Sequence, residues 1–471
     1  MFCVSFLIII TYKRFCLSRL IFSILLLSTI SFASLVNSGF IYSDLKILED
    51  LDLDRSFITD PKLQKTYQRI INNNQKRYAK HLNDAHLFVP KIKQILKEND
   101  IPPAFLYLVM AESNFSLNAK SYKKALGLWQ FMPKTGKIFG LKQDEYVDER
   151  MDIIKSTRAA VSYLKSLKKR FGKWYLAAIA YNCGEGRVYE ALTRSTLDMY
   201  LEDNKKTKQT KEFRKIISLY QKKKLPFNKL YKVYKEVRKY NYTPGIKELL
   251  HFQKGLRRQY LPGESQEYIR KIISLGLMNN REFLINGDNA HLLNRGISEP
   301  IITVQIKGGV LLEDVGKLVG MSYDNIHGLN KHIKQGLISP EYETYDIYLP
   351  YSVLSRFQAN IENIKDAKYA MHKVKSGDSL YQIAKKYKIN YKLIKKFNKL
   401  SSNVLSINQK LIIPVAASFA PKNDEIYIIK SGDTLSAIAK IYKIKLSKLM
   451  KDNKISSSLI NIGDKIVISY E

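Results

Sequence analysis

The sequence predicts a multidomain protein in which a mainly α-helical domain is followed by small α+β modules of strand–helix–helix–strand (βααβ) order. Its 471 residues allow about three domains, and more if some are small. Apolar residues recur at helical spacing through much of residues 101–190, as amphipathic and buried helices require. The C-terminal part contains a gapless internal repeat, which indicates repeated small modules.

The composition is strongly basic, with a formal net charge of +35 and 45% hydrophobic residues. This hydrophobic content is enough to bury real cores. A charge of this size is typical of nucleic-acid binding. However, Lys, Ile and Asn are plentiful along the whole chain, so part of the excess fits a generally Lys-rich composition.

The N-terminus predicts export. Basic residues precede the apolar segment 21–30, which is shorter than a membrane span, and small residues at positions 31–33 suit cleavage after Ala33. We therefore expect a signal peptide at residues 1–33. Because the stretch before Lys13 is also apolar, an uncleaved membrane anchor stays open as the alternative. An exported chain rarely meets nucleic acid, so we expect no nucleic-acid partner.

Cysteine and histidine usage excludes several kinds of chemistry. Cys3 and Cys16 lie in the predicted signal peptide, so the mature chain keeps only Cys183 and forms no intramolecular disulfide. With no histidine beside it in the sequence, Cys183 is expected to be a buried, inert thiol rather than a nucleophile. The histidines are scattered without ligand spacing, so no metal and no cofactor are expected.

The catalytic candidate lies on the helix expected after residues 34–84, which we interpret as a helical leader. Pro102 and Pro103 suit the first turn of a helix. Phe105, Leu108, Val109 and Glu112 follow at helical spacing, so they share one face. A carboxyl held against apolar side chains resists ionisation, which raises its pKa and keeps Glu112 available as a general acid. The alternative is a carboxylate at a frayed helix end.

Three further segments complete the helical domain, expected at residues 85–290. A segment with Trp129 follows a loop through Ser121, and helices are expected at 156–170 and 174–183. Trp129 and Met132 are interpreted as core or wall. Asp148, Glu149 and Arg150 are expected to form an ion-pair cluster that fixes the loop.

Residues 204–258 interrupt this domain with 18 Lys or Arg and 3 Glu, a net charge of +15. Pro226 and Pro244 divide the stretch into short helices, and aromatic residues are interleaved. We interpret it as a basic helical insertion. It is either a surface for an anionic polymer or lipid phosphate, or a solvated helical hairpin.

The internal repeat aligns residues 374–389 with 429–444. Gly377 and Gly432 are expected to permit a turn, and Asp378 and Asp433 to cap the next helix. Modules are expected at 369–415 and 425–471, with a degenerate copy at 300–351 that has Gly308-Gly309 but lacks the Asp. Residues 352–368 and 415–424 are expected to be linkers.

The helical-domain motifs resemble the lytic transglycosylases with a goose-type lysozyme fold, of the membrane-bound lytic transglycosylase D type. The motifs are Glu112-Ser113, Ser121, residues 127–133, 147–164 and 178–188, and Leu261-Pro262-Gly263-Glu264 with Tyr268. The repeats resemble LysM modules. The fold implied is therefore a lysozyme-like catalytic domain followed by LysM modules.

The resemblance implies a catalytic site with one carboxyl group. Glu112 would protonate the oxygen between N-acetylmuramic acid and N-acetylglucosamine (MurNAc-β-1,4-GlcNAc), then accept the proton of the muramic 6-hydroxyl, leaving a 1,6-anhydro end. The substrate-binding residues implied are Ser113, Ser121, Gln130, Met132, Tyr181 and Asn182. Of these, Tyr181 would hydrogen-bond Glu112, and Asn182 would support the same turn.

The LysM resemblance implies peptidoglycan glycan strands as the partner. The glycan-binding residues implied are Gly377, Asp378, Ser379, Leu380 and Ile407 in one groove, and Gly432, Asp433, Thr434, Leu435 and Ile462 in the other. Asn408 stands where the family often has Gly, as at Gly463. The degenerate copy is expected to bind sugar poorly or not at all.

The expected location is the periplasm or cell envelope of a Gram-negative bacterium, and the sequence predicts no oligomeric state. Two alternative functions stay open. One is a hydrolytic muramidase on the same scaffold, and the other is a non-catalytic wall-binding scaffold that relies on the repeats.

Overall fold

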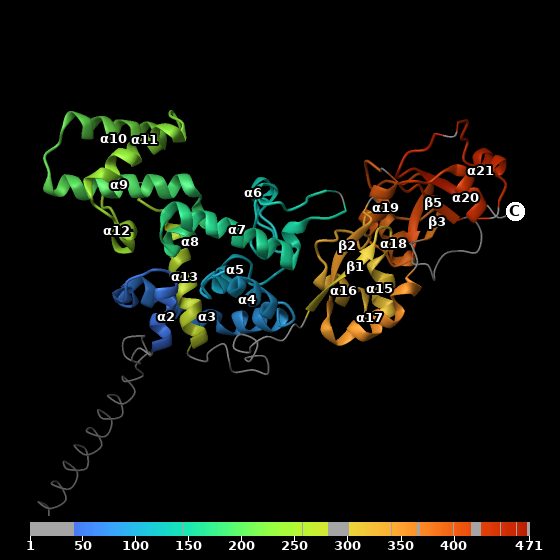
Figure 1. Ribbon diagram of the computed structural model, residues 1–471, viewed down its shortest axis with the longest axis horizontal. Coiled ribbons are helices and arrows are strands. Elements are labelled where there is room, and N and C mark those ends of the chain that lie inside the picture. The colour runs from blue at the N-terminus through green and yellow to red at the C-terminus, as the bar shows by residue number, and fades with distance from the viewer. Residues whose placement is uncertain are drawn as a thin grey trace, which may run out of the picture. The chain divides into compact units, whose positions relative to one another are not determined.

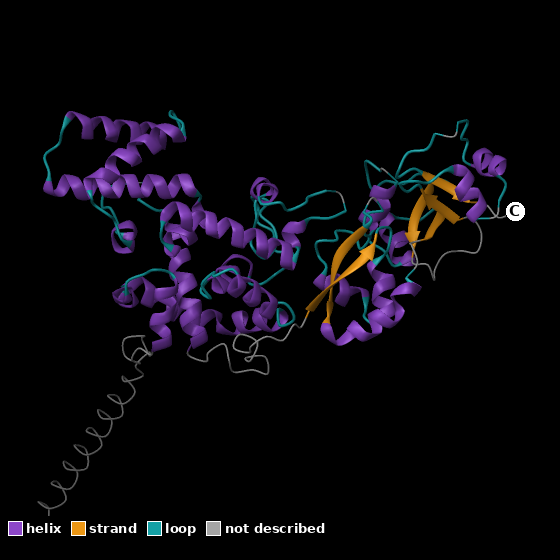
Figure 2. Cartoon of the chain, in the orientation of Figure 1, coloured by secondary structure: helices purple, strands orange, loops and turns teal. Residues whose placement is uncertain are grey.

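The computed structural model describes residues 42–280, 301–364, 368–415 and 425–468, except residues 145, 257, 341, 399, 443 and 458. The predicted signal peptide, Cys3, Cys16 and most of the expected linker at 415–424 lie outside these residues. The chain divides into two compact units, Met1–Gln75 with Phe171–Leu284 and Lys76–Arg170 with Ile285–Glu471. Figure 1 labels the elements, and Figure 2 shows that the strands belong to the C-terminal modules.

The described residues of the first unit are helical. Their elements are α2 (Tyr42–Asp50), the 3-10 helix η1 (Arg55–Thr59), the first part of α3 (Pro61–Asp84), α8 (Trp174–Cys183), α9 (Glu185–Asp203), α10 (Lys208–Gln221), α11 (Phe227–Val237), the 3-10 helix η3 (Arg238–Tyr240), α12 (Ile246–Leu250) and α13 (Gly263–Asn280). Helix α13 packs against α2 and α8. An ion pair between the buried Arg270 and the half-buried Asp60, Nε to Oδ1 at 3.0 Å, ties α13 to the start of α3.

The basic stretch 204–258 forms the helices α10, α11 and α12, with Pro226 and Gly245 as the residues before α11 and α12. The prediction that prolines divide it is thus confirmed. Helices α10 and α11 lie side by side and pack against α9 (Figure 1). The interleaved aromatic residues take part in this packing, because Tyr231 and Tyr234 both lie edge-on to Tyr189 of α9.

The second unit begins with helices and continues with the modules. Its helices before the modules are the last part of α3, α4 (Val89–Glu98), α5 (Phe105–Ser113), α6 (Pro133–Ile138), the 3-10 helix η2 (Glu149–Met151) and α7 (Ile153–Phe171). Helix α7 has Ala160, Leu164 and Leu167 buried at helical spacing, and α4 contacts α5.

Three βααβ modules follow. Their elements are β1 (Ile301–Lys307), α15 (Leu312–Val319), α16 (Tyr323–Leu329) and β2 (Thr344–Pro350); β3 (Lys368–Lys373), α18 (Leu380–Tyr387), α19 (Tyr391–Phe397) and β4 (Lys410–Val415); β5 (Glu425–Ile428), α20 (Leu435–Ile441), α21 (Leu446–Asp452) and β6 (Lys465–Ile468). In each module the two strands pair antiparallel. The predicted element order is confirmed, including that of the degenerate copy.

The expected linker at 352–368 is wrong for most of its length. Residues 351–363 form η4 (Tyr351–Val353), α17 (Leu354–Asn360) and η5 (Ile361–Asn363). Phe357 of α17 is buried in the core of the first module, and Arg356 donates to the Val319 carbonyl at 2.9 Å. One buried aromatic residue therefore makes this segment part of the module. Among the described residues, no helix is long and apolar enough to cross a bilayer.

Candidate active site

Helix α5 presents Glu112 near its C-terminal end. Every side chain from Phe105 to Met110 is buried, whereas Glu112 is half-buried. The helix begins at Phe105, so Pro102 and Pro103 lie just before it and not in its first turn as predicted. Their carbonyls accept from the amides of the first two helical residues, each at 3.0 Å. The helix is therefore enclosed on all sides and not on the predicted face alone. Glu112 is the only residue of α5 with a carboxyl side chain.

The chain turns sharply just after Glu112. Asn114 and Phe115 both have positive φ angles, 50° and 58°, a conformation that is rare for residues other than glycine and strained for a bulky one. The Asn114 side-chain oxygen is buried and finds no hydrogen-bond partner within the described residues. Such strain and unsatisfied acceptors gather at functional sites. The sequence analysis missed Asn114, although the Glu-Ser-Asn-Phe run contained it.

Ser113 is buried, and its hydroxyl donates to the Val109 carbonyl at 3.1 Å. This bond turns the side chain back onto its own helix. The geometry favours an anchoring role over the predicted substrate contact.

Ser121 and Gln130 belong to one tightly bonded loop. Ser121 Oγ accepts from the Ala125 amide at 3.0 Å. The Gln130 amide nitrogen donates to the carbonyls of Ala119 at 3.0 Å and Gly127 at 2.8 Å. Both hydrogens of that nitrogen are therefore used to shape the loop, and the amide oxygen is the atom of Gln130 best suited to a ligand.

Arg150 holds this loop from the other side. Its guanidinium donates to the carbonyls of Lys124 at 2.8 Å and Phe131 at 3.2 Å, and pairs with Asp148 at 2.7 Å. Gly127 is required here, because a Cβ would lie 1.8 Å from the Arg150 carbonyl oxygen. Glu149 pairs separately with Lys155 at 2.8 Å. The predicted ion-pair cluster is therefore confirmed for Asp148 and Arg150, but Glu149 pairs with Lys155 instead of Arg150.

Trp129 and Met132 have opposite environments. Trp129 is fully buried and donates from Nε1 to Thr157 Oγ1 at 2.9 Å, which confirms it as core. Met132 is 42% exposed just before α6, so it can form part of a wall but is not core.

In the first unit, Tyr181 and Asn182 lie in the last turn of α8, which ends at Cys183 as predicted. Asn182 Oδ1 accepts from Ser265 Oγ of α13 at 2.6 Å, so this side chain joins two helices instead of supporting the turn expected. Cys183 is half-buried, and burial raises the pKa of its thiol. A raised pKa keeps the thiol protonated and supports the inert interpretation.

The two C-terminal modules show which predicted groove residues reach solvent. Gly377, Ser379, Gly432 and Thr434 are exposed, and Ile407 and Ile462 are 64% and 58% exposed although apolar. The prediction that Leu380 and Leu435 line the grooves stays a prediction, but their side chains do not reach solvent. Both are buried in the module cores, because each begins the first helix with its side chain facing inward.

The roles expected for the turn residues need one further correction. Gly377 and Gly432 have φ angles of 86° and 85°, as the predicted turn requires. However, Asp378 and Asp433 do not cap the helices. Their carboxylates accept from the Lys375 and Lys430 amides and so close the preceding turn. The helices are capped instead by the neighbouring hydroxyls, Ser379 to the Gln382 amide and Thr434 to the Ala437 amide.

Comparison with known families now identifies each part. The model described as "Transglycosylase SLT domain" matches residues 90–198. That described as "Lytic transglycosylase MltD, LysM-like domain" matches 301–366, and "LysM domain" matches 372–414 and 427–469. By these domains the chain is a lytic transglycosylase.

Two curated relatives show how far the likeness extends. The transglycosylase is 27% identical over 425 residues to membrane-bound lytic murein transglycosylase D of Escherichia coli, covering 85% of this chain and 81% of that one. It is 40% identical over 102 residues to N-acetylmuramoyl-L-alanine amidase sle1 of Staphylococcus saprophyticus, covering 21% and 31%. A solved structure, the Bacillus cereus spore cortex-lytic enzyme SleL, matches at 30% identity over 21% of this chain and 22% of that chain, with a TM-score of 0.11.

The sequence analysis also missed a buried carboxylate in the transglycosylase domain. Glu190 of α9 is fully buried and bonded to Arg187 at 2.5 Å, Arg258 at 2.5 Å and Gln221 at 2.7 Å. Burial opposes ionisation, but the hydrogen bonds and positive charges of these partners outweigh it, so the pKa of Glu190 is lowered. Because Gln221 and Arg258 come from the basic stretch, the cluster fastens that stretch to α9. No group of three or more His, Cys, Asp or Glu suited to a metal occurs among the described residues.

Proposed function

We propose that this lytic transglycosylase cleaves peptidoglycan glycan strands at the MurNAc-β-1,4-GlcNAc bond and leaves 1,6-anhydro-MurNAc ends. The observation that supports it is the setting of Glu112, a half-buried carboxyl at the end of a helix that is otherwise enclosed by apolar packing. It lies within the stretch that matches the transglycosylase family model. A general acid needs this combination of restricted solvation and access to substrate.

Glu112 would act twice in one cycle. Its protonated carboxyl first donates to the glycosidic oxygen as the bond from that oxygen to the muramoyl anomeric carbon breaks. The resulting carboxylate then accepts the proton of the muramoyl 6-hydroxyl as O6 bonds to the same carbon. The proton lost in the first step returns in the second, so no net water is consumed. Most glycosidases divide such work between two carboxyls, whereas α5 supplies one.

The loop that follows α5 in the sequence offers groups of the kind that bind an amino sugar. The Ser121 hydroxyl accepts from the Ala125 amide and can donate its own hydrogen to an acetamido oxygen. The exposed Met132 can pack against a sugar face. Tyr181 we propose as a hydrogen-bond partner of Glu112, as the family resemblance implies.

The LysM domains are proposed to hold the glycan strand while the transglycosylase domain cuts it. The exposed apolar side chains of Ile407 and Ile462 support this, because exposed apolar groups beside polar turns suit the faces and edges of sugars. Secretion through the segment 1–33 and a periplasmic site of action are proposed with it.

Mass spectrometry of digested peptidoglycan tests the chemistry. Wild-type protein is expected to release muropeptides with 1,6-anhydro ends, and Glu112→Gln to lower the rate by at least about 100-fold, because general acid–base catalysis contributes that much. Reducing ends would instead identify a hydrolytic muramidase. No turnover by folded wild-type protein would leave a non-catalytic wall-binding scaffold.

A matched control separates loss of the catalytic group from loss of charge. Glu98 is the last residue of α4, is exposed, and lies in the same unit. Glu98→Gln removes one carboxylate from a helix end and is expected to keep wild-type turnover. Equal losses in Glu98→Gln and Glu112→Gln would contradict the assignment of Glu112.

A further inference from the structure

The MltD-type LysM-like module, residues 301–366, makes an unusual set of contacts with the transglycosylase domain. Tyrosine hydroxyls at and before β2 donate to carboxylates of the segment 144–152. Tyr345 donates to Glu149 Oε1 at 2.9 Å and Tyr348 to Asp152 Oδ1 at 2.5 Å, and Tyr342 donates to Asp144. Hydrogen bonds to a carboxylate are stronger than those between neutral groups.

Backbone pairing reinforces the side-chain bonds. Val147 forms an isolated antiparallel bridge with Ile333. The Asp148 amide donates to the His332 carbonyl, and the Lys334 amide to the Tyr146 carbonyl, each at 2.9 Å. The transglycosylase segment is thus paired to the module as a short strand would be, so the register between the two is fixed.

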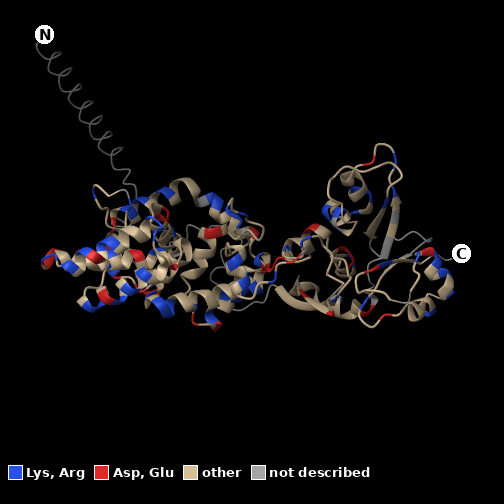
Figure 3. Cartoon of the chain, turned by 90° about the horizontal axis from the view of Figure 1, so that it is seen from above, with Lys and Arg blue, Asp and Glu red and all other residues tan. Residues whose placement is uncertain are grey.

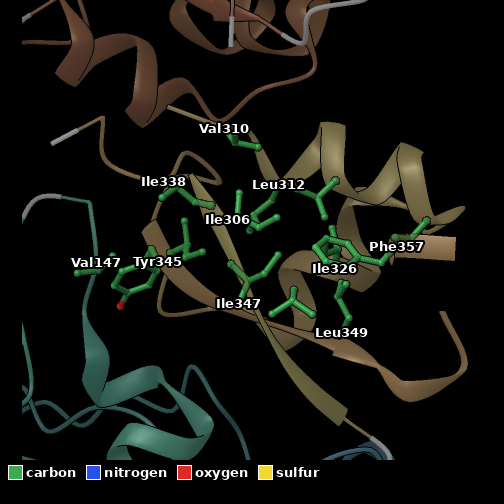
Figure 4. Close-up of a cluster of buried hydrophobic side chains, with 14 residues drawn as sticks. Val147, Ile306, Val310, Leu312, Ile326, Ile338, Tyr345, Ile347, Leu349 and Phe357 are labelled. Carbon is green, nitrogen blue, oxygen red and sulfur yellow. The ribbon is translucent and has the colours of Figure 1, made fainter. Parts of the chain in front are cut away.

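The contact is also buried from solvent. Val147 is fully buried within the core of the module, where Figure 4 shows it beside Tyr345. Asp152 and His332 have no exposed surface. Burial and the carboxylates of Glu149 and Asp152 raise the pKa of Tyr345, so its phenol stays a donor. Buried hydrogen bonds of this kind are strong and costly to leave unmade.

The bonded segment leads directly to the candidate active site. Glu149 and Asp152 flank Arg150, and Arg150 holds the Lys124 and Phe131 carbonyls of the loop that carries Ser121 and Gln130. Asp152 also accepts from the Ile154 and Lys155 amides at the start of α7. Whatever fixes Glu149 and Asp152 therefore also fixes the position of Arg150 and of the loop.

We propose that the LysM-like module is a positioning element of the transglycosylase domain, with Tyr345 and Tyr348 as the positioning residues. The expected effect on turnover rests on the proposed function. The module holds the 149–152 segment so that Arg150 keeps the Ser121–Gln130 loop in the geometry that positions the bound sugar for reaction. Misplacement of such groups by about 1 Å can cost up to about 100-fold in rate.

The test replaces both tyrosines in the full chain, as Tyr345→Phe/Tyr348→Phe, and keeps the rings. Turnover of a short soluble glycan is measured beside hydrogen exchange of the amides of residues 119–131. Tyr323→Phe is the matched control, because Tyr323 is half-buried in the same module and stacks on His327. The carboxylates that act on it are Glu313 and Asp324, which do not belong to the segment 144–152. If the double variant does not fold, Tyr345→Phe alone is used.

We expect kcat to fall by about tenfold, KM to change little, and exchange to quicken at residues 119–131, while Tyr323→Phe matches wild type. A lower unfolding temperature with unchanged kcat and unchanged exchange would overturn the proposal, because it would show a merely structural contact. Inactive wild-type protein would contradict the proposed function instead. The exchange measurement would then still decide the positioning role.

Discussion

The LysM-like module at 301–366 and the LysM domain at 372–414 have one fold but different surroundings. In both, an asparagine joins the second helix to the closing strand. Asn330 donates to the Ile326 and Tyr348 carbonyls, and Asn398 donates to the Ile394 and Ile412 carbonyls, all at 2.8 Å. Asn453 makes the equivalent hydrogen bonds in the last module. The three modules therefore share this internal link between the second helix and the closing strand.

The two modules differ where the first helix begins. The residue before that helix is Ser379 in the LysM domain, an exposed hydroxyl that caps the helix. In the LysM-like module it is Leu311, which makes no side-chain cap. Leu311 is buried against Leu393 and Phe397 of the LysM domain. At this position the LysM domain therefore has a hydroxyl in solvent, whereas the LysM-like module has a leucine packed against another module.

The largest effect is expected from exchanging these two residues. Leu311→Ser removes a buried leucine and places a hydroxyl among apolar side chains, which costs about 4 kcal/mol of unfolding free energy. Ser379→Leu removes an exposed cap and costs about 1 kcal/mol. Calorimetry of the full chain measures both. Equal destabilisation by the two variants would break the comparison, since it would show that burial at Leu311 contributes nothing beyond a lost cap.

A pH effect is expected in the LysM-like module. Burial, and then the nearby Lys331, lower the pKa of His327 from its ordinary value of 6.5 to about 4. Between these values the unfolded chain binds more protons than the folded one. The free energy of unfolding should therefore fall as the pH is lowered from 6.5 to 4, by at most about 3 kcal/mol.

His327→Gln isolates this effect from the titration of carboxylates over the same pH range. The difference in unfolding free energy between wild type and variant should shrink or reverse toward pH 4, and grow toward pH 7. A difference that stays constant with pH would show that His327 titrates normally in the folded protein. The matching position in the LysM domain has no such histidine, because residue 395 is a lysine.

The sequence predicted what local pattern determines. Helical spacing and paired prolines gave α5, and the glycine after Cys183 gave the end of α8. The gapless repeat predicted two βααβ modules, and weaker similarity predicted the third, which lacks the typical Asp. Each of these depends on residues close together in the chain, where periodicity and turn chemistry act directly.

The contacts between distant segments could not be predicted. Nothing near Tyr345 indicates that its hydroxyl meets Glu149, 196 residues away. The amide hydrogens of Gln130 are used by two loop carbonyls that only the folded loop brings together. The cap was assigned to Asp378 instead of Ser379 because both residue types cap helices. The two residues are neighbours, so the choice depends on where the helix begins.

The sequence alone also could not show on which side of the basic helices the charged residues lie. Figure 3 shows Lys and Arg along many helices, with fewer acidic residues among them. The basic stretch 204–258 has both an exposed side rich in lysine and a packed side, where Arg258 reaches the buried Glu190. Its aromatic residues serve that packing. A net charge alone cannot distinguish the two sides.

The smallest effect is expected at the turn that closes each LysM domain. Asn408 adopts a φ of 70° where the last module has Gly463 at 89°, and both amides donate to the first strand's end, at Val374 and Ile429, at 2.8 Å. Because asparagine tolerates this conformation, Asn408→Gly should change the unfolding free energy by less than about 1 kcal/mol. Asn408→Val should cost more, since a branched side chain fits poorly at positive φ. If calorimetry found the two variants equally stable, the turn of the LysM domain at 372–414 would not need the left-handed geometry of its counterpart, and the likeness of the two grooves would fail at this residue.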